Sequence, residues 1–355
     1  MSDRAARVEA RLDGAGADLL LVTNLVNLRY LTGFTGSNGM CVLGPGVRRF
    51  VTDFRYVEQV AAEVSGFQTE RGPQDFLEAL RGPWPEGRVR LGFEDQHLSV
   101  RQHERLRRIL PDRVELVAAG GLVEAERMVK EPAEVERIRA AAELADEALG
   151  ETLAGGLVGR TERAVALELE QALRRRGAEP SFASIVASGA HGALPHAQPR
   201  DAEIARDVLV TIDWGAQLDG YCSDCTRTFA TGPVGGELLE IYELVERAQA
   251  AALDAVRPGP RGREVDAVAR ALIGDAGHGE HFGHGLGHGV GLEIHEAPRL
   301  SRTGEDPLAP GHVVTVEPGV YVPEVGGVRI EDLAVVTAEG AEVLSGLPKA
   351  LAVVA

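Results

Sequence analysis

Four acidic residues in the second half of the chain end or interrupt apolar, β-branched runs, and this placement constrains the fold more than any other feature. Asp213 lies in TIDWG, Asp224 in YCSDCTR, Glu317 in VEPGVY and Glu331 in VRIED. Glu317 and Glu331 should point from the end of a buried strand toward a cleft, where an unpaired carboxylate is costly. A bound cation would remove that cost.

Together with His288 of GHGLGHGVG, these acids form a hard, oxygen-rich set of potential metal ligands. Such a set suits two divalent ions that share bridging carboxylates, and two metals that clamp a water are typical of hydrolases. Each motif alone is a weak signal. A core salt bridge between Glu331 and Arg329, or surface charges beside a loop for the aspartates, are the competing interpretations.

The segment VLVTIDWGAQLDGYCSDCTRTFAT predicts a β-hairpin, because Asp219-Gly220 is a turn signal with apolar or β-branched residues on both sides. If its loop centres near Leu218, Asp213 and Asp224 fall almost opposite one another, with Cβ atoms about 5 Å apart. Two carboxylates that close repel unless a cation lies between them. The neighbouring Cys222 and Cys225 are interpreted as packing residues.

Histidines gather in HFGHGLGHGVGLEIHEAP, which contains His281, His284, His288 and His295. The glycines between them let backbone and side chains approach a site closely. A metal interpretation makes one of these histidines a ligand and leaves the others as proton carriers or substrate contacts. The competing interpretation is a polar, Gly-rich surface loop. His196, in SIVASGAHGALPHAQP, is a further candidate.

The pattern of elements divides the chain near Gly120-Gly121. Before this point, helix and strand patterns alternate, which predicts an α/β domain over residues 1–121. After it, over residues 122–355, helical patterns alternate with strand pairs, which predicts an antiparallel sheet with helices packed outside it. The helices are expected at 131–149, 161–177, 236–256 and 263–276, and the strands at 183–188, 207–213, 221–230, 312–317 and 328–337.

Composition narrows the class of protein. The chain has 355 residues and a formal net charge of -17, which argues against nucleic acid or an anionic membrane as the main partner. No glycine-rich phosphate-binding motif opens a helix of the first domain. The start lacks an apolar signal core and three cysteines cannot form a disulfide framework, so we expect a cytoplasmic protein.

With these motifs in hand, the chain closely resembles the M24 metallopeptidases, which share the pita-bread fold. IDWGAQLDGYCSDCTRTF, GHGLGHGVGLEIHE, VEPGVY and RIED stand in family order, with 11 residues between the aspartates, 29 from His288 to Glu317 and 14 from there to Glu331. The resemblance is greatest to the Xaa-Pro subgroup of aminopeptidase P and prolidase. NLRYLTGFTGSNG and TDFRY resemble the creatinase-type N-terminal domain of that subgroup.

The resemblance implies a role for each site residue, as follows. The metal ligands are Asp213, Asp224, His288, Glu317 and Glu331, with Asp224 and Glu331 bridging two divalent ions. His196, His295 and Glu317 are catalytic, Glu317 as the proton shuttle. His284, Tyr221, Tyr321 and Arg329 bind substrate or lie close to it. The expected ion is Mn²⁺, with Co²⁺, Zn²⁺ or Fe²⁺ as alternatives.

The implied reaction is hydrolysis of the N-terminal Xaa-Pro bond of peptides by a metal-bridging hydroxide. Aminopeptidase P of the small bacterial type is the favoured interpretation, with prolidase, which cleaves dipeptides, as the alternative. A prolidase needs a positive group to bind the proline carboxylate, and the sequence singles out no arginine for it. A metal-free binding protein and a creatinase-like C–N hydrolase are remote alternatives. The subgroup further implies a homodimer.

Overall fold

The computed structural model describes residues 3–73 and 75–355. The chain divides into two compact units, Met1–Arg127 and Met128–Ala355. The expected boundary at residue 121 falls just before helix α5 (Leu122–Met128), which contributes to the first unit because Glu126 and Arg127 bond to Arg7 and Asn27 there. Within the described residues, no helix combines the length and apolar character needed to cross a membrane.

The first unit is built around a mixed six-stranded sheet of order β4-β3-β2-β1-β5-β6. Central β1 pairs antiparallel with β2 and parallel with β5, so a hairpin and a parallel α/β motif share one sheet. The strands are β1 (Leu19–Val22), β2 (Gly39–Gly44), β3 (Val47–Thr52), β4 (Gln68–Arg71), β5 (Val89–Phe93) and β6 (Val114–Ala118). The predicted α/β class of this domain is confirmed.

The helices of the first unit complete the alternation. They are α1 (Arg4–Glu9), α2 (Leu25–Thr32), α3 (Val57–Glu63), α4 (Val100–Ile109) and α5, with short 3-10 helices at Asp13–Ala15 and Phe76–Arg81. Ser99 begins α4 with a capping box, in which its hydroxyl and the Gln102 side chain each accept a backbone N–H. Leu106 and Ile109 of α4 are buried in the core beneath the sheet.

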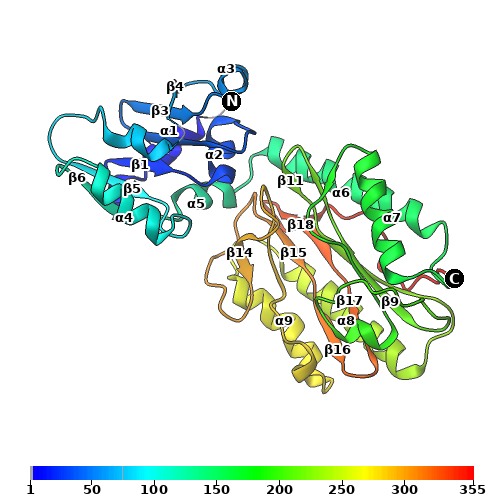
Figure 1. Ribbon diagram of the computed structural model, residues 1–355. Helices are drawn as coiled ribbons and strands as arrows, with labels where there is room; N and C mark the ends of the chain where they lie inside the picture. The colour runs from blue at the N-terminus through cyan, green and yellow to red at the C-terminus, as the bar shows by residue number, and fades with distance from the viewer. Residues whose placement is uncertain (1–2, 74) are drawn as a thin grey trace. The chain divides into compact units, whose positions relative to one another are not determined.

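The second unit consists of short antiparallel sheets with two helix pairs packed outside them, as predicted (Figure 1). One half holds α6 (Pro132–Leu153) and α7 (Glu162–Arg175) against the sheet β12-β9-β8. The strands of this half are β7 (Glu179–Pro180), β8 (Ile185–Ser188), β9 (Leu209–Trp214), β10 (Ala216–Leu218), β11 (Tyr221–Cys222) and β12 (Cys225–Ala230).

The other half packs α8 (Gly236–Ala255) and α9 (Gly262–Asp275) against later strands. These are β13 (Gly287–Gly289), β14 (Glu296–Leu300), β15 (Val313–Val316), β16 (Gly319–Val322), β17 (Gly326–Arg329), β18 (Asp332–Val336) and β19 (Ala341–Val343). The sheet order is β14-β13-β15-β18-β19, with β16-β17 as a separate hairpin. The single strand expected over residues 328–337 is therefore two strands, which separate at Ile330-Glu331.

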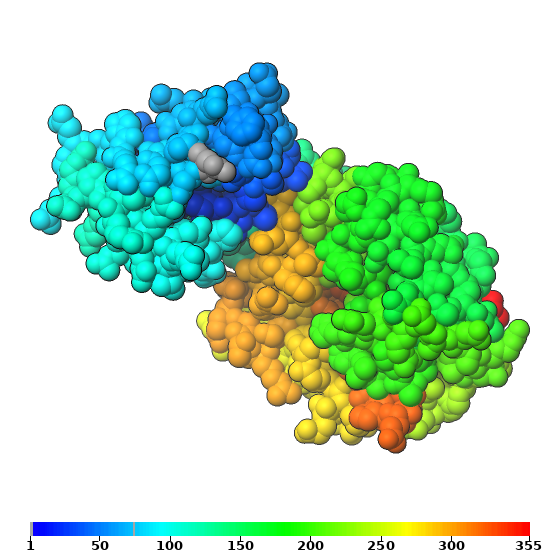
Figure 2. All heavy atoms as spheres, viewed as in Figure 1, coloured from blue at the N-terminus to red at the C-terminus, as the bar shows by residue number. Residues whose placement is uncertain are grey.

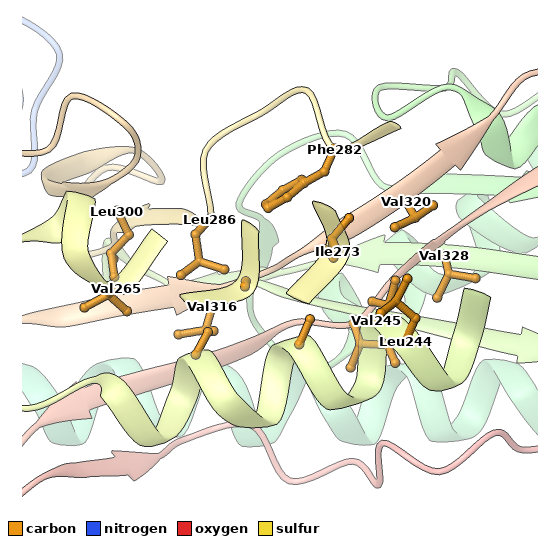
Figure 3. Close-up of a cluster of buried hydrophobic side chains, with 14 of the residues drawn as sticks. Leu244, Val245, Val265, Ile273, Phe282, Leu286, Leu300, Val316, Val320 and Val328 are labelled. Carbon is orange, nitrogen blue, oxygen red and sulfur yellow. The ribbon is translucent and has the colours of Figure 1, made fainter. Parts of the chain in front are cut away.

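The core of this half lies between α8, α9 and the strands (Figure 3). Leu244 and Val245 of α8 lie beside Val328 of β17, and Val316 of β15 belongs to the same cluster (Figure 3). Burying an aliphatic side chain of this size contributes roughly 1.5–3 kcal/mol. This core fixes β15 and β17, whose ends carry two of the predicted ligands.

Candidate metal centre

The hairpin that carries the two aspartates turns at Asp219-Gly220, and both residues have positive φ, 49° and 82°. Leu218 therefore pairs with Tyr221, and the register continues to Asp213, which lies opposite Thr226. The sequence placed Asp213 and Asp224 almost opposite one another for a loop centred near Leu218, but the turn centres one residue later, so Asp224 lies two positions from Thr226, the direct partner of Asp213. Asp224 is instead a diagonal neighbour of Asp213, on the same face of the hairpin.

Three carboxylates meet at this point. Asp213, Asp224 and Glu331 each offer one oxygen, and these oxygens lie within 4.8 Å of one another. Glu331 reaches the hairpin because the chain leaves β17 for β18 at this residue, where its backbone N–H donates to the Thr226 carbonyl at 3.0 Å. One Glu331 oxygen accepts a hydrogen bond from the Thr226 hydroxyl at 2.7 Å.

His288 and Glu317 extend this cluster from the other half of the unit. His288 Nε2 lies 3.5 Å from an Asp224 oxygen and 3.3 Å from a Glu317 oxygen. Its Nδ1 lies 3.1 Å from the Gly289 carbonyl, and this contact fixes the ring with Nε2 toward the carboxylates. The Thr315 hydroxyl donates to Glu317 at 3.1 Å. All five predicted ligands therefore converge.

The charges of the cluster are crowded. Burial raises the pKa values of Asp224 and Glu331 well above their ordinary values, and neighbouring carboxylates raise them further. Burial also raises the pKa of Asp213, although Arg329 beside it works in the opposite direction. Burial opposes the shift at Glu317, but the hydrogen bond and charge of His288 lower its pKa to about 2.

Two buried oxygens of the cluster test whether a cation fits. Asp213 Oδ1 and Glu331 Oε1 have no hydrogen-bond partner among the residues that the structure describes. An unsatisfied buried carboxylate oxygen is costly, and a divalent cation satisfies such oxygens directly. The residues present therefore fit divalent metal ions. The competing Glu331–Arg329 bridge is not formed, because the Arg329 guanidinium donates to Asp213 Oδ2 at 2.6 Å.

The cluster opens into a cavity of about 710 Å³. The surface of the second unit is hollowed between green residues around 180–200 and orange residues around 290–300 (Figure 2). The polar lining includes the five predicted ligands with His196, His284, His295, Arg299 and Arg329, and the apolar lining includes Phe182, Ile185, Pro195 and Ile294.

The predicted histidines divide into two groups. His196, His284 and His295 line the cavity, and His284 Nε2 lies 2.9 Å from the Tyr321 hydroxyl. Burial lowers the pKa values of His284 and His295, which favours neutral imidazoles near neutral pH. His281 faces His278, with the two Nδ1 atoms 3.2 Å apart, and does not line the cavity.

The two tyrosines predicted near substrate lie behind the cavity wall. Tyr221 is buried and its hydroxyl donates to Glu134 of α6 at 2.8 Å. Tyr321 is also buried, and its hydroxyl accepts from Arg329 Nη1 at 2.9 Å. Neither tyrosine lines the cavity. Cys222 and Cys225 are buried free thiols, in agreement with their interpretation as packing residues.

Two features of the site escaped the sequence prediction. Arg299 lines the cavity from β14, and nothing in the motif EAPRL marks it. What places Arg299 at the site is the pairing of β14 with β13, which sets it opposite His288. This pairing cannot be recognised in the sequence. Glu162, at the first residue of α7, bonds to the segment that carries His196. An acid after a helix cap is too common to mark a site.

Comparisons with known proteins agree with this geometry. The model of "Metallopeptidase family M24" matches residues 136–338, and that of "Creatinase/Prolidase N-terminal domain" matches residues 4–129. An Xaa-Pro dipeptidase of Pyrococcus horikoshii is 36% identical over 350 residues, covering 97% of each chain.

Solved structures give the same result. The structure of an Xaa-Pro dipeptidase from Bacillus anthracis superimposes with a TM-score of 0.95 at 40% identity, covering 99% of each chain. The structure of an X-Pro aminopeptidase from Thermotoga maritima superimposes with a TM-score of 0.90 at 34% identity, covering 99% of this chain and 100% of that one. The family depends on divalent metal ions, in agreement with the carboxylate cluster. The chain therefore belongs to metallopeptidase family M24, with a creatinase/prolidase-type N-terminal domain and a pita-bread domain.

Proposed function

We propose that this metallopeptidase is an Xaa-Pro dipeptidase, which hydrolyses the bond before proline in dipeptides. The observation that carries the proposal is Arg299, a cationic side chain in the wall of the cavity. A dipeptide ends in a carboxylate only two bonds from the scissile nitrogen, so a cation beside the metal centre selects short substrates.

The position of Arg299 supports this role. It is the cross-strand partner of His288, and directly opposed residues project from the same face with Cβ atoms about 5 Å apart. Its side chain is exposed, and its guanidinium makes no hydrogen bond or ion pair with any residue that the structure describes. An arginine fork that is free to rotate can bind a carboxylate through two parallel hydrogen bonds.

Aminopeptidase P, which the sequence alone favoured, is the second candidate. The similar structure from Thermotoga maritima is named an X-Pro aminopeptidase, whereas the relatives from Pyrococcus horikoshii and Bacillus anthracis are named Xaa-Pro dipeptidases. An aminopeptidase P needs room for residues beyond proline. The two candidates share the metal ligands and differ in what Arg299 contacts.

The proposed chemistry assigns each group one task. Divalent ions held by Asp213, Asp224, His288, Glu317 and Glu331 would supply Lewis acidity and an activated water. Glu317, at the edge of the cavity, takes the proton of the attacking water and gives it to the leaving proline nitrogen. His196 and His295 donate hydrogen bonds to the substrate carbonyl oxygen as it becomes negative.

Arg329 and the apolar wall complete the proposed site. Arg329 holds Asp213 through its 2.6 Å hydrogen bond, so this carboxylate keeps one oxygen for a metal ion. Proline forms a tertiary amide without an N–H, so its recognition depends on shape rather than on a hydrogen-bond acceptor. Ile294 and Pro195 offer an apolar surface for such a ring.

The test compares kcat/KM for Ala-Pro, Ala-Pro-NH₂ and Ala-Pro-Ala in the presence of Mn²⁺. We expect Ala-Pro to be preferred and Arg299→Gln to raise its KM about 10- to 100-fold, since a hydrogen bond to a charged group contributes roughly 1.5–3 kcal/mol. The same substitution should leave cleavage of Ala-Pro-NH₂ unchanged, because this substrate has no carboxylate.

Arg302→Gln is the matched control, since Arg302 is exposed three residues further on and does not line the cavity. A wild-type preference for Ala-Pro-Ala would reject the dipeptidase and leave aminopeptidase P. A purified protein that holds no divalent ion and stays inactive with added Mn²⁺ would reject both. Mn²⁺ as the native ion, a cytoplasmic location and a homodimer remain predictions.

A further inference from the structure

One wall of the cavity is a segment without extended secondary structure, between β8 and β9. The segment called the 188–200 loop begins at Ser188, the last residue of β8, contains a short 3-10 helix at Gly189–Ala193 and otherwise has no helix or strand. It supplies five consecutive lining residues, Pro195, His196, Ala197, Gln198 and Pro199. A loop that carries a catalytic side chain has to be held in place by contacts outside itself.

A single carboxylate holds both ends of this loop. Glu162, whose side chain is 0% exposed, accepts hydrogen bonds from the Ser188 N–H at 2.9 Å and hydroxyl at 2.8 Å. It also accepts from the Arg200 N–H at 3.0 Å and from the Arg200 guanidinium at 3.0 and 3.1 Å. His191 Nδ1, between these ends, lies 3.0 Å from the same carboxylate.

These contacts are unusual for an acid at the start of a helix. A glutamate in the first turn is generally favoured by the helix dipole and by capping of the helix's own N–H groups. In α7 the Thr161 hydroxyl already accepts the Ala164 N–H, and the hydrogen bonds of Glu162 go to the loop instead. Arg200 and Ser188 lower the pKa of Glu162 to about 2 even though burial opposes this shift, so the anchor is ionised at neutral pH.

The loop has a third attachment at the metal centre. The Pro195 carbonyl accepts from Arg329 Nη1 at 3.1 Å, while Nη2 of the same side chain donates to Asp213. The residue before His196 is thus tied to a predicted ligand, and the loop ends are tied to Glu162. His196 itself is exposed to the cavity, and the structure gives its imidazole no hydrogen bond to a described residue. Its position therefore depends on the loop backbone.

We infer that Glu162 is a positioning residue for the peptidase reaction, which acts by holding the 188–200 loop so that His196 faces the substrate. The inference rests on the proposed function of His196. It extends the functional residues to a side chain that touches neither substrate nor metal. Displacement of a reacting group by about 1 Å can cost roughly 100-fold in rate, which sets the scale of the expected effect.

The experiment is a double-mutant cycle on the full-length, metal-loaded protein, with Glu162→Gln, His196→Ala and both together. The amide keeps the size of Glu162 but replaces one acceptor oxygen with a donor and removes the charge. We expect Glu162→Gln to lower kcat/KM for Ala-Pro about 10- to 100-fold with its metal content unchanged. In the His196→Ala background the same substitution should cause no further loss.

Glu168→Gln is the matched control, because Glu168 lies on the same helix and pairs with Arg160 rather than with the loop. It should leave kcat/KM at the wild-type value. Hydrogen exchange gives a readout that does not depend on activity. Amides of residues 189–199 should exchange faster in Glu162→Gln, while those of α7 keep their wild-type rates.

Several outcomes would overturn the inference. Independent, multiplying effects of the two substitutions would mean that Glu162 does not act through His196, and wild-type activity in His196→Ala would remove its basis. A wild-type protein that cleaves no Xaa-Pro bond would instead reject the proposed function. Should Glu162→Gln not fold, Arg200→Gln replaces it in the same cycle. This substitution removes the guanidinium that bonds to Glu162, and the Arg200 side chain is 49% exposed.

Discussion

At the residue scale, the candidate centre is a balance between carboxylates and very few positive charges. Arg329 neutralises Asp213 through a hydrogen bond of 2.6 Å, whereas Asp224 and Glu331 have, among the described residues, only the His288 imidazole and the Thr226 hydroxyl beside them and repel each other. Like charges this close raise each other's pKa, and a divalent cation relieves the repulsion. The metal-free protein should therefore be strained at these two residues.

Asp224→Asn tests this balance, because it removes one negative charge at constant size. We expect the variant to lose bound metal and to lose at least about 100-fold in kcat/KM. Mutation of residues that only hydrogen-bond to a metal ligand already costs about 10- to 100-fold in metal affinity or activity. Stripped of metal, it should melt at a higher temperature than the stripped wild type, because one repelling charge is gone. Metal analysis, activity and thermal melts in EDTA measure the three effects.

Asp219→Asn is the control, since Asp219 lies in the exposed turn of the same hairpin. It should keep wild-type metal content and activity. Wild-type turnover in Asp224→Asn would refute the assignment of Asp224 as a ligand. A lower melting temperature than that of the stripped wild type would refute the charge repulsion.

The sequence identified site residues only where a residue type is unusual for its local pattern. Glu317 and Glu331 stand out because an acid follows a buried apolar run, and that cost is visible without a structure. Arg299 and Glu162 do not stand out, because an arginine in a strand and a glutamate in a first helical turn are ordinary. Their importance arises from strand pairing and from a loop more than 25 residues away, and both are tertiary facts.

At the element scale, long elements were predictable and very short ones were not. The periodicity of α6 to α9 predicted four helices, and all four are present. Strands β7 and β13, of two or three residues each, leave no periodic pattern to detect, whereas the equally short β11 was included in the strand expected over 221–230. The hairpin register also depends on local detail, since moving a turn by one residue changes which residues face each other.

Strand β13 carries His288 and has room only for glycine at its first residue. A Cβ on Gly287 would lie 2.0 Å from the Thr315 carbonyl oxygen, which is backbone and cannot rotate away. We expect Gly287→Ala to lower the free energy of unfolding by about 1–3 kcal/mol, the usual cost of overpacking. Because the strand must move, metal binding should weaken as well. Chemical denaturation and metal titration measure the two effects.

Gly283→Ala is the matched control from the same glycine-rich segment, because a Cβ there meets no atom within 4 Å. Its stability and metal affinity should equal those of the wild type. Equal stability of the Gly287 and Gly283 variants would show that β13 can shift at no cost. Some of the glycines between the histidines are thus expected to allow close backbone packing, as at Gly287. Others, such as Gly283, are expected to tolerate a side chain.

At the scale of the whole molecule, the chain contains two units with separate cores, and only the second contains the carboxylate cluster. The fold class of both units was predictable, because alternation of helix and strand patterns is a property of long stretches of sequence. Part of the net charge of -17 belongs to the cluster, so bound cations change the charge of the second unit substantially. Metal should therefore govern the stability of that unit.

Removal of metal should destabilise the protein more strongly as pH rises above the ordinary pKa range of carboxylic acids. The folded-state pKa values of Asp224 and Glu331 are raised, so without metal the stability that they contribute is present at low pH and is lost as pH rises through those values. The lowered pKa of Glu317, about 2, gives a contribution that stays constant above about pH 5. Bound cations remove the repulsion between these carboxylates, so the metal-loaded protein should not lose this stability as pH rises.

Calorimetry with and without EDTA measures this difference at a series of pH values. The gap between the two melting temperatures should widen with pH, and Asp224→Asn should flatten its rise. A gap that stays constant or narrows would mean that the crowded carboxylates do not limit the stability of the metal-free unit.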